Sequence, residues 1–238
     1  NPRQRTVEEL YPFDMGGGLR LKSNFHAFGY LEHGKELIEH IGFVNTSART
    51  VEVSVIKESV SGLLDIQMPE RVEAGASGDI VLRYAVAERS DIYGTMRDIV
   101  YLEVDGVKAY YPLSTQVVVV DNFDNMDDIS APRLVVSKNI IKFGDVNVSN
   151  GVLERMVELR NEGASPLVVR RIECSDRAVE CVVDRDVVIA AGESMEIVVR
   201  IYGNRIEDVD NPLVARLYVI TNDPMRPMQT IRVNAIPI

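Results

Sequence analysis

The chain lacks the residues from which several functional classes are built. Tryptophan is absent, aromatic residues make up 6% of the 238 residues, and there are two cysteines. Two cysteines are too few for the disulfide framework of a small secreted domain or for a zinc site of paired CxxC motifs. No segment approaches the ~20 consecutive apolar residues that a membrane-spanning helix needs. The sequence therefore predicts no transmembrane span.

Positive charge is also scarce. The sequence has 26 Lys and Arg residues against 36 Asp and Glu residues, which gives a formal net charge of -10 at pH 7. Such a chain repels phosphate backbones and anionic lipids, and no local cluster of basic residues offsets the excess. Nucleic acids and anionic membranes are therefore poor candidate partners.

Catalytic and cofactor-binding motifs are missing as well. The sequence has no GxSxG nucleophile elbow, HExxH zinc motif, P-loop or GxGxxG fingerprint. These absences favour a chain that is not an enzyme and holds no cofactor. An enzyme that assembles dispersed Asp, Glu and His residues in a cleft between two domains is a weaker alternative.

Three histidines, His26, His33 and His40, recur at intervals of seven residues. The residues around His26 alternate as in a strand, where an odd spacing sends side chains to opposite faces. His33 falls in an expected turn at Glu32-His33-Gly34. Ordinary surface histidines are the favoured interpretation, and a metal site across a hairpin is the alternative.

What the chain does contain is an internal repeat of about 115 residues. Residues 19–29 align with residues 134–144, and residues 72–84 align with residues 189–201. Apolar and polar residues alternate in both copies, which is typical of half-buried strands. An apolar spacing of i, i+2, i+5 that starts at Val51, and again in the second copy, predicts a β-bulge in each. The sequence thus predicts an all-β chain of two tandem β-sandwiches.

The predicted boundaries follow the repeat. The first sandwich, with an N-terminal extension, spans residues 1–120, and the second spans residues 133–238. Residues 121–132 contain four aspartates and end in Ala-Pro, so they are expected to form a solvated acidic linker. Clustered carboxylates also suit Ca²⁺, but the segment lacks the Gly and the closing Glu of an EF-hand loop, so a calcium site is a minor alternative.

The stretch TNDPMRP, residues 221–227, lies between two alternating segments. Asn and Asp form Asx turns and Pro fixes φ, so the composition is mainly that of a chain reversal, equivalent to an expected hairpin at Asp105-Gly106. Exposed loops at the ends of sandwiches also carry binding residues. The candidate interaction residues in this loop are Asn222, Asp223, Pro224 and Arg226.

Four motifs then occur in a recognisable order: Phe143-Gly144, Asn161-Glu162-Gly163, Ala191–Ser194 and Thr221–Pro227. Their order resembles the immunoglobulin-like domains of the Hydin and ASPM type, and above all bacterial relatives of unknown function in cell-envelope proteins. The first copy resembles them through the repeat, with Asn-Thr-Ser in place of Asn-x-Gly. The resemblance implies immunoglobulin-like sandwiches in the periplasm or at the cell surface of a bacterium. The relatives often carry Cys-Gly-Cys where this chain reads ECSDRAVEC.

The resemblance also implies a scaffold or interaction role rather than a reaction. The expected function is a non-catalytic cell-envelope module that binds a protein or a glycan through sheet edges and loops. The alternative is a two-domain periplasmic chaperone that acts by β-strand donation. The acidic linker argues against it, because such a chaperone needs a basic anchor between its domains. The chain opens NPRQRT without Met, which predicts that a leader or anchor has been removed.

Cys174 and Cys181 are candidates for a disulfide if the chain works outside the cytoplasm, as the resemblance implies. If the segment between them turns near Asp176-Arg177, the cysteines lie on neighbouring antiparallel segments, whose Cα atoms are about 4.5–5.5 Å apart. Two buried free thiols are an equal alternative.

Overall fold

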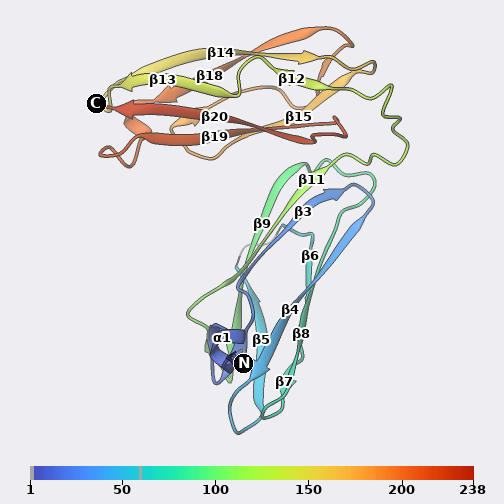
Figure 1. Ribbon diagram of the computed structural model, residues 1–238, viewed down its shortest axis with the longest axis vertical. Helices are drawn as coiled ribbons and strands as arrows, with labels where there is room; N and C mark the ends of the chain where they lie inside the picture. Colours follow the sequence, from blue (N-terminus) through green and yellow to red (C-terminus); the bar gives the residue numbers. More distant parts are fainter. Residues whose placement is uncertain (1–2, 59–60) are drawn as a thin grey trace. The chain divides into compact units, whose positions relative to one another are not determined.

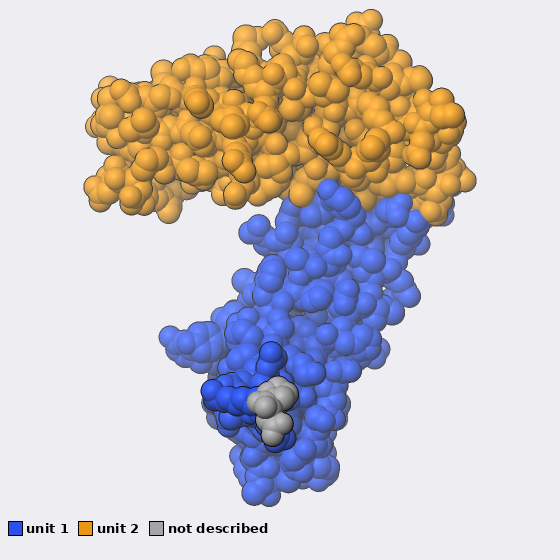
Figure 2. All heavy atoms as spheres, in the orientation of Figure 1, with its two compact units in different colours: residues 1–119 blue, residues 120–238 orange. Residues whose placement is uncertain are grey.

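The computed structural model describes residues 3–58 and 61–238, and nearly all of its regular structure is β. The chain divides into two compact units, residues 1–119 and residues 120–238, coloured separately in Figure 2. Each unit is an immunoglobulin-like β-sandwich with two sheets. The predicted fold class is therefore confirmed.

Unit 1 begins with a short helix, α1 (Val7–Leu10), closed by a capping box in which Thr6 and Glu9 bond to each other's backbone amides. One sheet has the order β1-β2-β4-β8-β6 and the other the order β3-β11-β9-β5-β7, with β10 paired to β9. The strands are β1 (Phe13–Gly16), β2 (Leu19–Leu21), β3 (Phe25–Glu32), β4 (Glu36–Asn45), β5 (Val51–Lys57), β6 (Leu64–Gln67), β7 (Arg71–Val72), β8 (Ser77–Ala85), β9 (Gly94–Val104), β10 (Val107–Lys108) and β11 (Leu113–Val120).

Unit 2 has sheets of order β12-β14-β18-β16 and β13-β20-β19-β15-β17, and Figure 1 shows β14 and β18 in one layer and β19 and β20 in the other. A single 3-10 turn, η1 (Gly203–Arg205), follows β18. The strands are β12 (Leu134–Val136), β13 (Ile140–Val146), β14 (Val152–Asn161), β15 (Leu167–Cys174), β16 (Val179–Glu180), β17 (Val187–Ile189), β18 (Ser194–Tyr202), β19 (Leu213–Thr221) and β20 (Met228–Pro237).

The two units repeat one strand order. The path β2-β4-β8-β6 of unit 1 corresponds to β12-β14-β18-β16 of unit 2, and β3-β11-β9-β5-β7 corresponds to β13-β20-β19-β15-β17. Unit 1 adds β1 at one sheet edge and the short β10. The β9–β11 connection and the β19–β20 connection therefore occupy the same place in the fold.

Each sandwich has its own apolar core, because alternation places every second strand residue between the sheets. Leu82 and Leu102 are fully buried in unit 1, as are Leu159 and Leu217 in unit 2. Full burial of such a side chain stabilises the fold by about 1.5–3 kcal/mol.

The predicted bulge is confirmed in one copy and wrong in the other. In unit 2 the register between β15 and β19 shifts between Val169 and Arg171. In unit 1, β5 pairs with β9 without a shift, so Val55 continues the inward alternation and packs against the core. Ile56 therefore faces outward there, and its apolar character had suggested the bulge.

Two buried asparagines fix equivalent loops in the two units. Asn45 and Asn161 end β4 and β14 and are completely buried. Asn45 Nδ2 donates to the carbonyl oxygens of Arg49 (2.8 Å) and Val72 (3.0 Å). Asn161 Nδ2 makes the same pair of bonds to the residues four and 28 positions later, at 2.7 and 3.0 Å. Because each side chain is buried and its amide forms hydrogen bonds with two loop carbonyl oxygens, both units need an asparagine at this position.

The residue two positions after each asparagine completes this arrangement. Gly163 N–H donates to Asn161 Oδ1 at 2.9 Å, and a Cβ at Gly163 would lie 2.2 Å from the carbonyl oxygen of Ala131. In unit 1, Ser47 occupies this place, and both its N–H and its hydroxyl donate to Asn45 Oδ1. The change from Asn-x-Gly to Asn-x-Ser therefore preserves the hydrogen bond, and in unit 1 the close approach is made by Gly18, where a Cβ would lie 2.7 Å from the Ser47 Cβ.

Residues 121–132 belong with unit 2. Asp121 receives two hydrogen bonds from Arg170, at 3.0 Å from Nε and 2.5 Å from Nη2. At the other end Ala131 and Pro132 are buried, whereas Ile129 in the middle is 89% exposed. The segment is thus tied to unit 2 at both ends and open to solvent between them.

Candidate functional site

The TNDPMRP segment connects β19 to β20 and is built around two side chains that bond within unit 2. Asn222 Oδ1 accepts from Val168 N–H at 2.7 Å. Asp223 is 2% exposed and accepts hydrogen bonds from Leu134 N–H (2.9 Å) and from Arg133 Nη1 (3.2 Å). It also caps the turn through Met225 N–H at 2.9 Å. The loop therefore fixes the start of β12 as well as reversing the chain.

This geometry divides the candidate interaction residues. The side chains of Asn222 and Asp223 are committed to internal bonds, and Pro224 is half-buried. Arg226 is exposed, and so is Met225, which the sequence reasoning passed over. An interaction role of this loop remains a prediction. Arg226 and Met225 are the two side chains of the loop that a partner could contact.

The hairpin expected to join the cysteines is wrong. Cys174 ends β15 and Cys181 follows β16, and these two strands belong to different sheets of unit 2. The chain crosses between the sheets through a turn in which Asp176 Oδ1 accepts from Ala178 N–H at 2.8 Å.

The two cysteines still lie close together. Both are free, and burial raises the pKa of each thiol, to about 12 for Cys181. The Cys181 backbone N–H bonds to the Cys174 thiol, which offsets part of the rise in the pKa of Cys174. A disulfide between them remains a prediction, and it would join the two sheets rather than close a hairpin.

The histidines occupy unlike positions. His26 lies on β3 with Nε2 3.6 Å from Glu39, and His40 lies on β4 with Nδ1 4.0 Å from Asp79. His33 is in the predicted turn, but it is 5% exposed rather than at the surface, because Nε2 bonds to the Ile92 carbonyl oxygen at 2.7 Å. Within residues 3–58 and 61–238, no group of three or more His, Cys, Asp or Glu side chains is arranged to hold a metal ion.

A buried polar cluster in unit 1 escaped sequence analysis. Asp98 is 2% exposed and accepts hydrogen bonds, all at 2.7 Å, from Ser61 N–H, Ser61 Oγ and Tyr84 Oη. Tyr84 Oη also lies 2.7 Å from Thr115 Oγ1. Burial raises the pKa of Tyr84, and the bond to Asp98 adds to the rise, although the Thr115 bond opposes it. The cluster is enclosed, so its carboxylate is not presented to a substrate.

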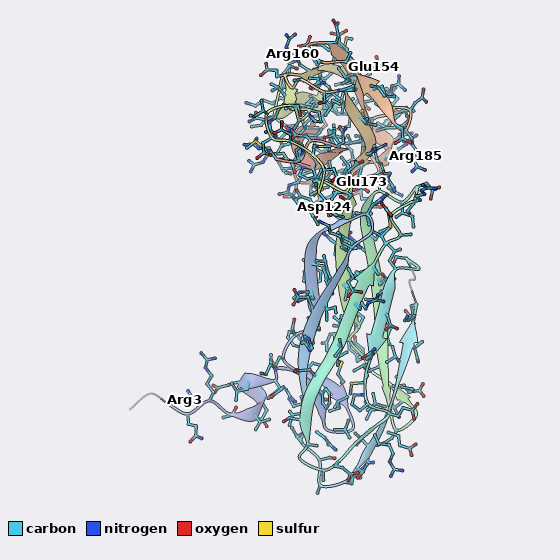
Figure 3. All side chains as sticks on the ribbon, turned by 90° about the vertical axis from the view of Figure 1, so that its right-hand side faces the viewer. Arg3, Asp124, Glu154, Arg160, Glu173 and Arg185 are labelled. Carbon is cyan, nitrogen blue, oxygen red and sulfur yellow. The ribbon has the colours of Figure 1, made fainter. Side chains whose placement is uncertain are left out.

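Many surface charges form ion pairs. Glu154 and Arg160, both on β14, point away from the core of unit 2 in Figure 3, and Glu154 pairs with Arg200 on β18. At the start of unit 1, Arg3 pairs with Glu9 at 3.1 Å. Such exposed pairs contribute about 0–1 kcal/mol each and are an ordinary solvated surface.

Exposed aromatic side chains, by contrast, are concentrated in unit 1. Tyr110 and Tyr111, between β10 and β11, are 86% and 55% exposed, and their rings meet edge to face at 4.8 Å. Phe25 at the start of β3 is 52% exposed. Asn24, which precedes it, accepts from Ser114 N–H at 2.9 Å, so the two segments run side by side. We call Phe25, Tyr110 and Tyr111 the aromatic surface. In the described part of unit 2 no aromatic side chain reaches this exposure.

Comparison with known proteins identifies the fold but no family. No family model matches the chain, and no curated protein does. A protein of unknown function from Porphyromonas gingivalis W83 has a similar structure, with a TM-score of 0.67 and 22% identity, over 92% of this chain and 100% of that chain. This similarity supports a shared two-sandwich fold and nothing further.

Two other solved structures are more distant. The PapD-like domain 7 of human CEP192 has a TM-score of 0.38 and 10% identity over 51% of this chain and 99% of that chain. A chaperone and tip adhesion subunit complex of Csu pili from Acinetobacter baumannii has a TM-score of 0.32 and 10% identity, over 92% of this chain and 99% of that chain. Likenesses this remote carry no functional argument. None of the described helices is long and apolar enough to cross a membrane.

Proposed function

We propose that the chain is a non-catalytic interaction module of the bacterial cell envelope, in the periplasm or at the cell surface, that binds a protein or a glycan. The aromatic surface of unit 1 is the observation that carries this proposal. Tyrosine offers a large, stiff contact area with a polar end, which is why it is enriched in binding surfaces. A chain with so few aromatic residues gains nothing in stability from leaving these three in water.

The surroundings of the aromatic surface suit recognition rather than chemistry. Lys108, two residues before Tyr110, pairs with Glu58 and has its Nζ 4.0 Å from the ring centre of the neighbouring Tyr101, so paired charges lie next to the exposed tyrosines in the chain. A rim of this kind orients a partner, while the exposed rings supply contact area. Periplasmic or surface location enters from the family resemblance and belongs to the proposal.

The test compares binding by the full chain and by two stability-matched variants. Arrays of bacterial surface glycans and of separated envelope proteins identify ligands for the wild type. Tyr110→Ser/Tyr111→Ser should then weaken binding at least about tenfold, since aromatic hot spots contribute about 2 kcal/mol or more. The control is Val182→Ser, because Val182 is an apolar side chain of unit 2 that is 78% exposed.

Two results would count against the proposal. If the double tyrosine variant binds as tightly as the wild type, the aromatic surface is not the binding site. Turnover of a bound glycan or protein, abolished by one carboxylate or histidine substitution, would make the chain an enzyme. A chaperone that donates a β-strand would instead lose binding through changes in an edge strand and keep it in the tyrosine variant.

A further inference from the structure

Unit 2 has a gap between its two sheets where the chain passes from β12 in one sheet to β13 in the other. β12 pairs with β14 in one sheet, whereas β13 runs parallel to β20 in the other and first pairs with it at Arg232. Residues 228–231 of β20 therefore have β19 on one side and no strand on the other. A groove of about 650 Å³ lies there, lined by residues 134–139 and by Arg226 and residues 228–230.

The backbone of β20 faces this groove with unused hydrogen-bonding groups. Thr221 N–H donates to the Pro227 carbonyl oxygen at 2.9 Å, so the odd-numbered residues at the start of β20 bond toward β19. Arg232 N–H donates to the Asn139 carbonyl oxygen at 2.9 Å on the opposite side. Because strand residues alternate, the backbone groups of Met228 and Thr230 point into the groove.

The opposite wall is the edge of β12. Ser137 N–H donates to the Glu158 carbonyl oxygen of β14 at 2.9 Å, so Val136 directs its backbone groups away from β14 and toward the groove. Leu134 is already used, since its N–H bonds to Asp223 and its carbonyl oxygen accepts from Gln229 Nε2 at 2.7 Å. Asp223 and Gln229 thus hold the two walls in fixed positions.

The groove carries positive charge in a chain of net charge -10. Its lining has no carboxylate, and it includes the exposed side chains of Lys138 and Arg226. Lys138 makes one long bond, 3.4 Å, to the Met156 carbonyl oxygen. A groove of the same volume in unit 1, along the edge of β5, is instead lined by three glutamates and one arginine. The positive lining is therefore particular to unit 2.

We propose that this groove binds an extended, acidic peptide segment of a partner protein by β-strand addition. The main chain of the segment would bond to Val136 on one side and to Met228 and Thr230 on the other, and its carboxylates would lie near Lys138 and Arg226. Main-chain bonds supply affinity in this mode and flanking charges supply specificity. The site is separate from the aromatic surface, so it does not depend on the function proposed above.

The continuity of β20 creates the site, because in unit 1 the returning chain is divided into β10 and β11, whereas β20 pairs with β19 without interruption from Met228. In unit 1 the equivalent connection turns at Asp105-Gly106, and Ser114 N–H bonds to Asn24 one residue after β11 begins. In unit 2, β20 begins four residues before Arg232, the residue that makes the corresponding bond. The uninterrupted β20 therefore extends beyond the start of β13, and its edge is left open.

The experiment uses the full chain and two pools of capped hexapeptides. The central four positions are randomised over Val, Thr, Ser and Ala, and the ends are Glu in one pool and Lys in the other. We expect the acidic pool to slow hydrogen exchange of the Val136, Met228 and Thr230 amides, and the basic pool to leave it unchanged. Lys138→Glu/Arg226→Glu should weaken binding of the acidic pool about tenfold, because two attractive surface contacts become repulsive.

A backbone variant tests strand addition itself. Thr230→Pro removes an N–H that faces the groove and makes no bond to β19, and proline is tolerated at such an edge. It should abolish protection of the other two amides, while Thr230→Ala should retain it. If Thr230→Pro fails to fold, the charge-reversal variant decides the matter.

Three outcomes would overturn the proposal: equal binding of the two pools, no protection of the three amides, or protection unaffected by charge reversal. Self-association of the peptide-free chain that protects the same amides would assign the groove to a second copy instead.

Discussion

We expect Asp98 to stabilise unit 1 through the hydrogen bonds of its buried cluster, so that removing its carboxylate alone lowers the free energy of unfolding. Asp98→Ala removes the acceptor of three hydrogen bonds, all at 2.7 Å, and leaves Ser61 N–H and Ser61 Oγ without it. Removing one partner from a buried charged network costs about 3–5 kcal/mol. Tyr84→Phe deletes one hydroxyl and should cost about 1 kcal/mol, because Asp98 keeps its bonds from Ser61.

Unit 2 shows what an apolar version of this cluster looks like. Tyr84 aligns with Ile201 in the repeat, and the facing pair Asp98 and Thr115 corresponds to the facing pair Ala215 and Val233. All three equivalents in unit 2 are buried. Replacing every member of a buried polar network by apolar residues of similar size is often close to neutral. The triple variant Tyr84→Phe/Asp98→Val/Thr115→Val still leaves Ser61 without its acceptor, but it removes the buried hydroxyls at positions 84 and 115 and fills the space of Asp98, so it should be more stable than Asp98→Ala alone.

Urea unfolding of the full chain, followed by NMR signals of unit 1, measures these free energies. A loss of about 3–5 kcal/mol moves the midpoint by roughly 1–5 M urea, given typical denaturant slopes of about 1–3 kcal/mol/M. The control is Asp65→Ala, since Asp65 is exposed on β6 and its loss should change stability by less than about 0.5 kcal/mol. The reasoning fails if Asp98→Ala costs no more than this control, or if the triple variant is less stable than Asp98→Ala.

Three further predictions concern titration, redox state and boundaries. The pKa of Tyr84 is raised on folding, so the stability it contributes is complete below the unfolded tyrosine pKa of about 10 and falls as the pH rises above it; Tyr84→Phe should flatten the pH dependence of unit 1 in this range. Counting thiols on unreduced, denatured protein from an oxidising compartment should find none, and two would rule the disulfide out. Residues 120–238 should fold alone and be about 1–3 kcal/mol more stable than residues 131–238, which lack the Asp121–Arg170 pair; equal stability of the two fragments would show that the pair contributes nothing.

Sequence patterns predicted the parts of the fold that depend on local chemistry. Alternation indicated the strands, and the repeat indicated two copies of one topology. The helix α1 was not predicted: Thr6 and Glu9 have the spacing of a capping box, but a helix of four residues is too short to show an apolar periodicity. The bulge in β5 was predicted wrongly because Ile56 is apolar yet faces outward, and alternation cannot distinguish an outward apolar residue from a shifted register.

Features that depend on distant segments were not predictable. Asp98 and Tyr84 meet across the core, and nothing near either residue in the chain indicates that contact. The separation of the cysteines into two sheets likewise depends on a crossover that looks like a hairpin in sequence. Asp223 could be assigned to a turn from its neighbours, but its bond to Leu134 N–H spans 89 positions. The sequence therefore indicated which residues form the loop at the candidate site, but not the distant residues to which they bond.

Comparison of the two units distinguishes the features that both sandwiches need from those that only one of them has. Asn45 and Asn161 make matching bonds in both units, so these bonds serve the sandwich itself. The connection between the last two strands differs: unit 1 places Tyr110 and Tyr111 in solvent there, whereas unit 2 uses TNDPMRP to hold β12 and to extend β20. Loops tolerate such changes because they lie outside the core. Both proposed binding features thus arise at one topological position, where a shared framework leaves the two copies free to recognise different partners.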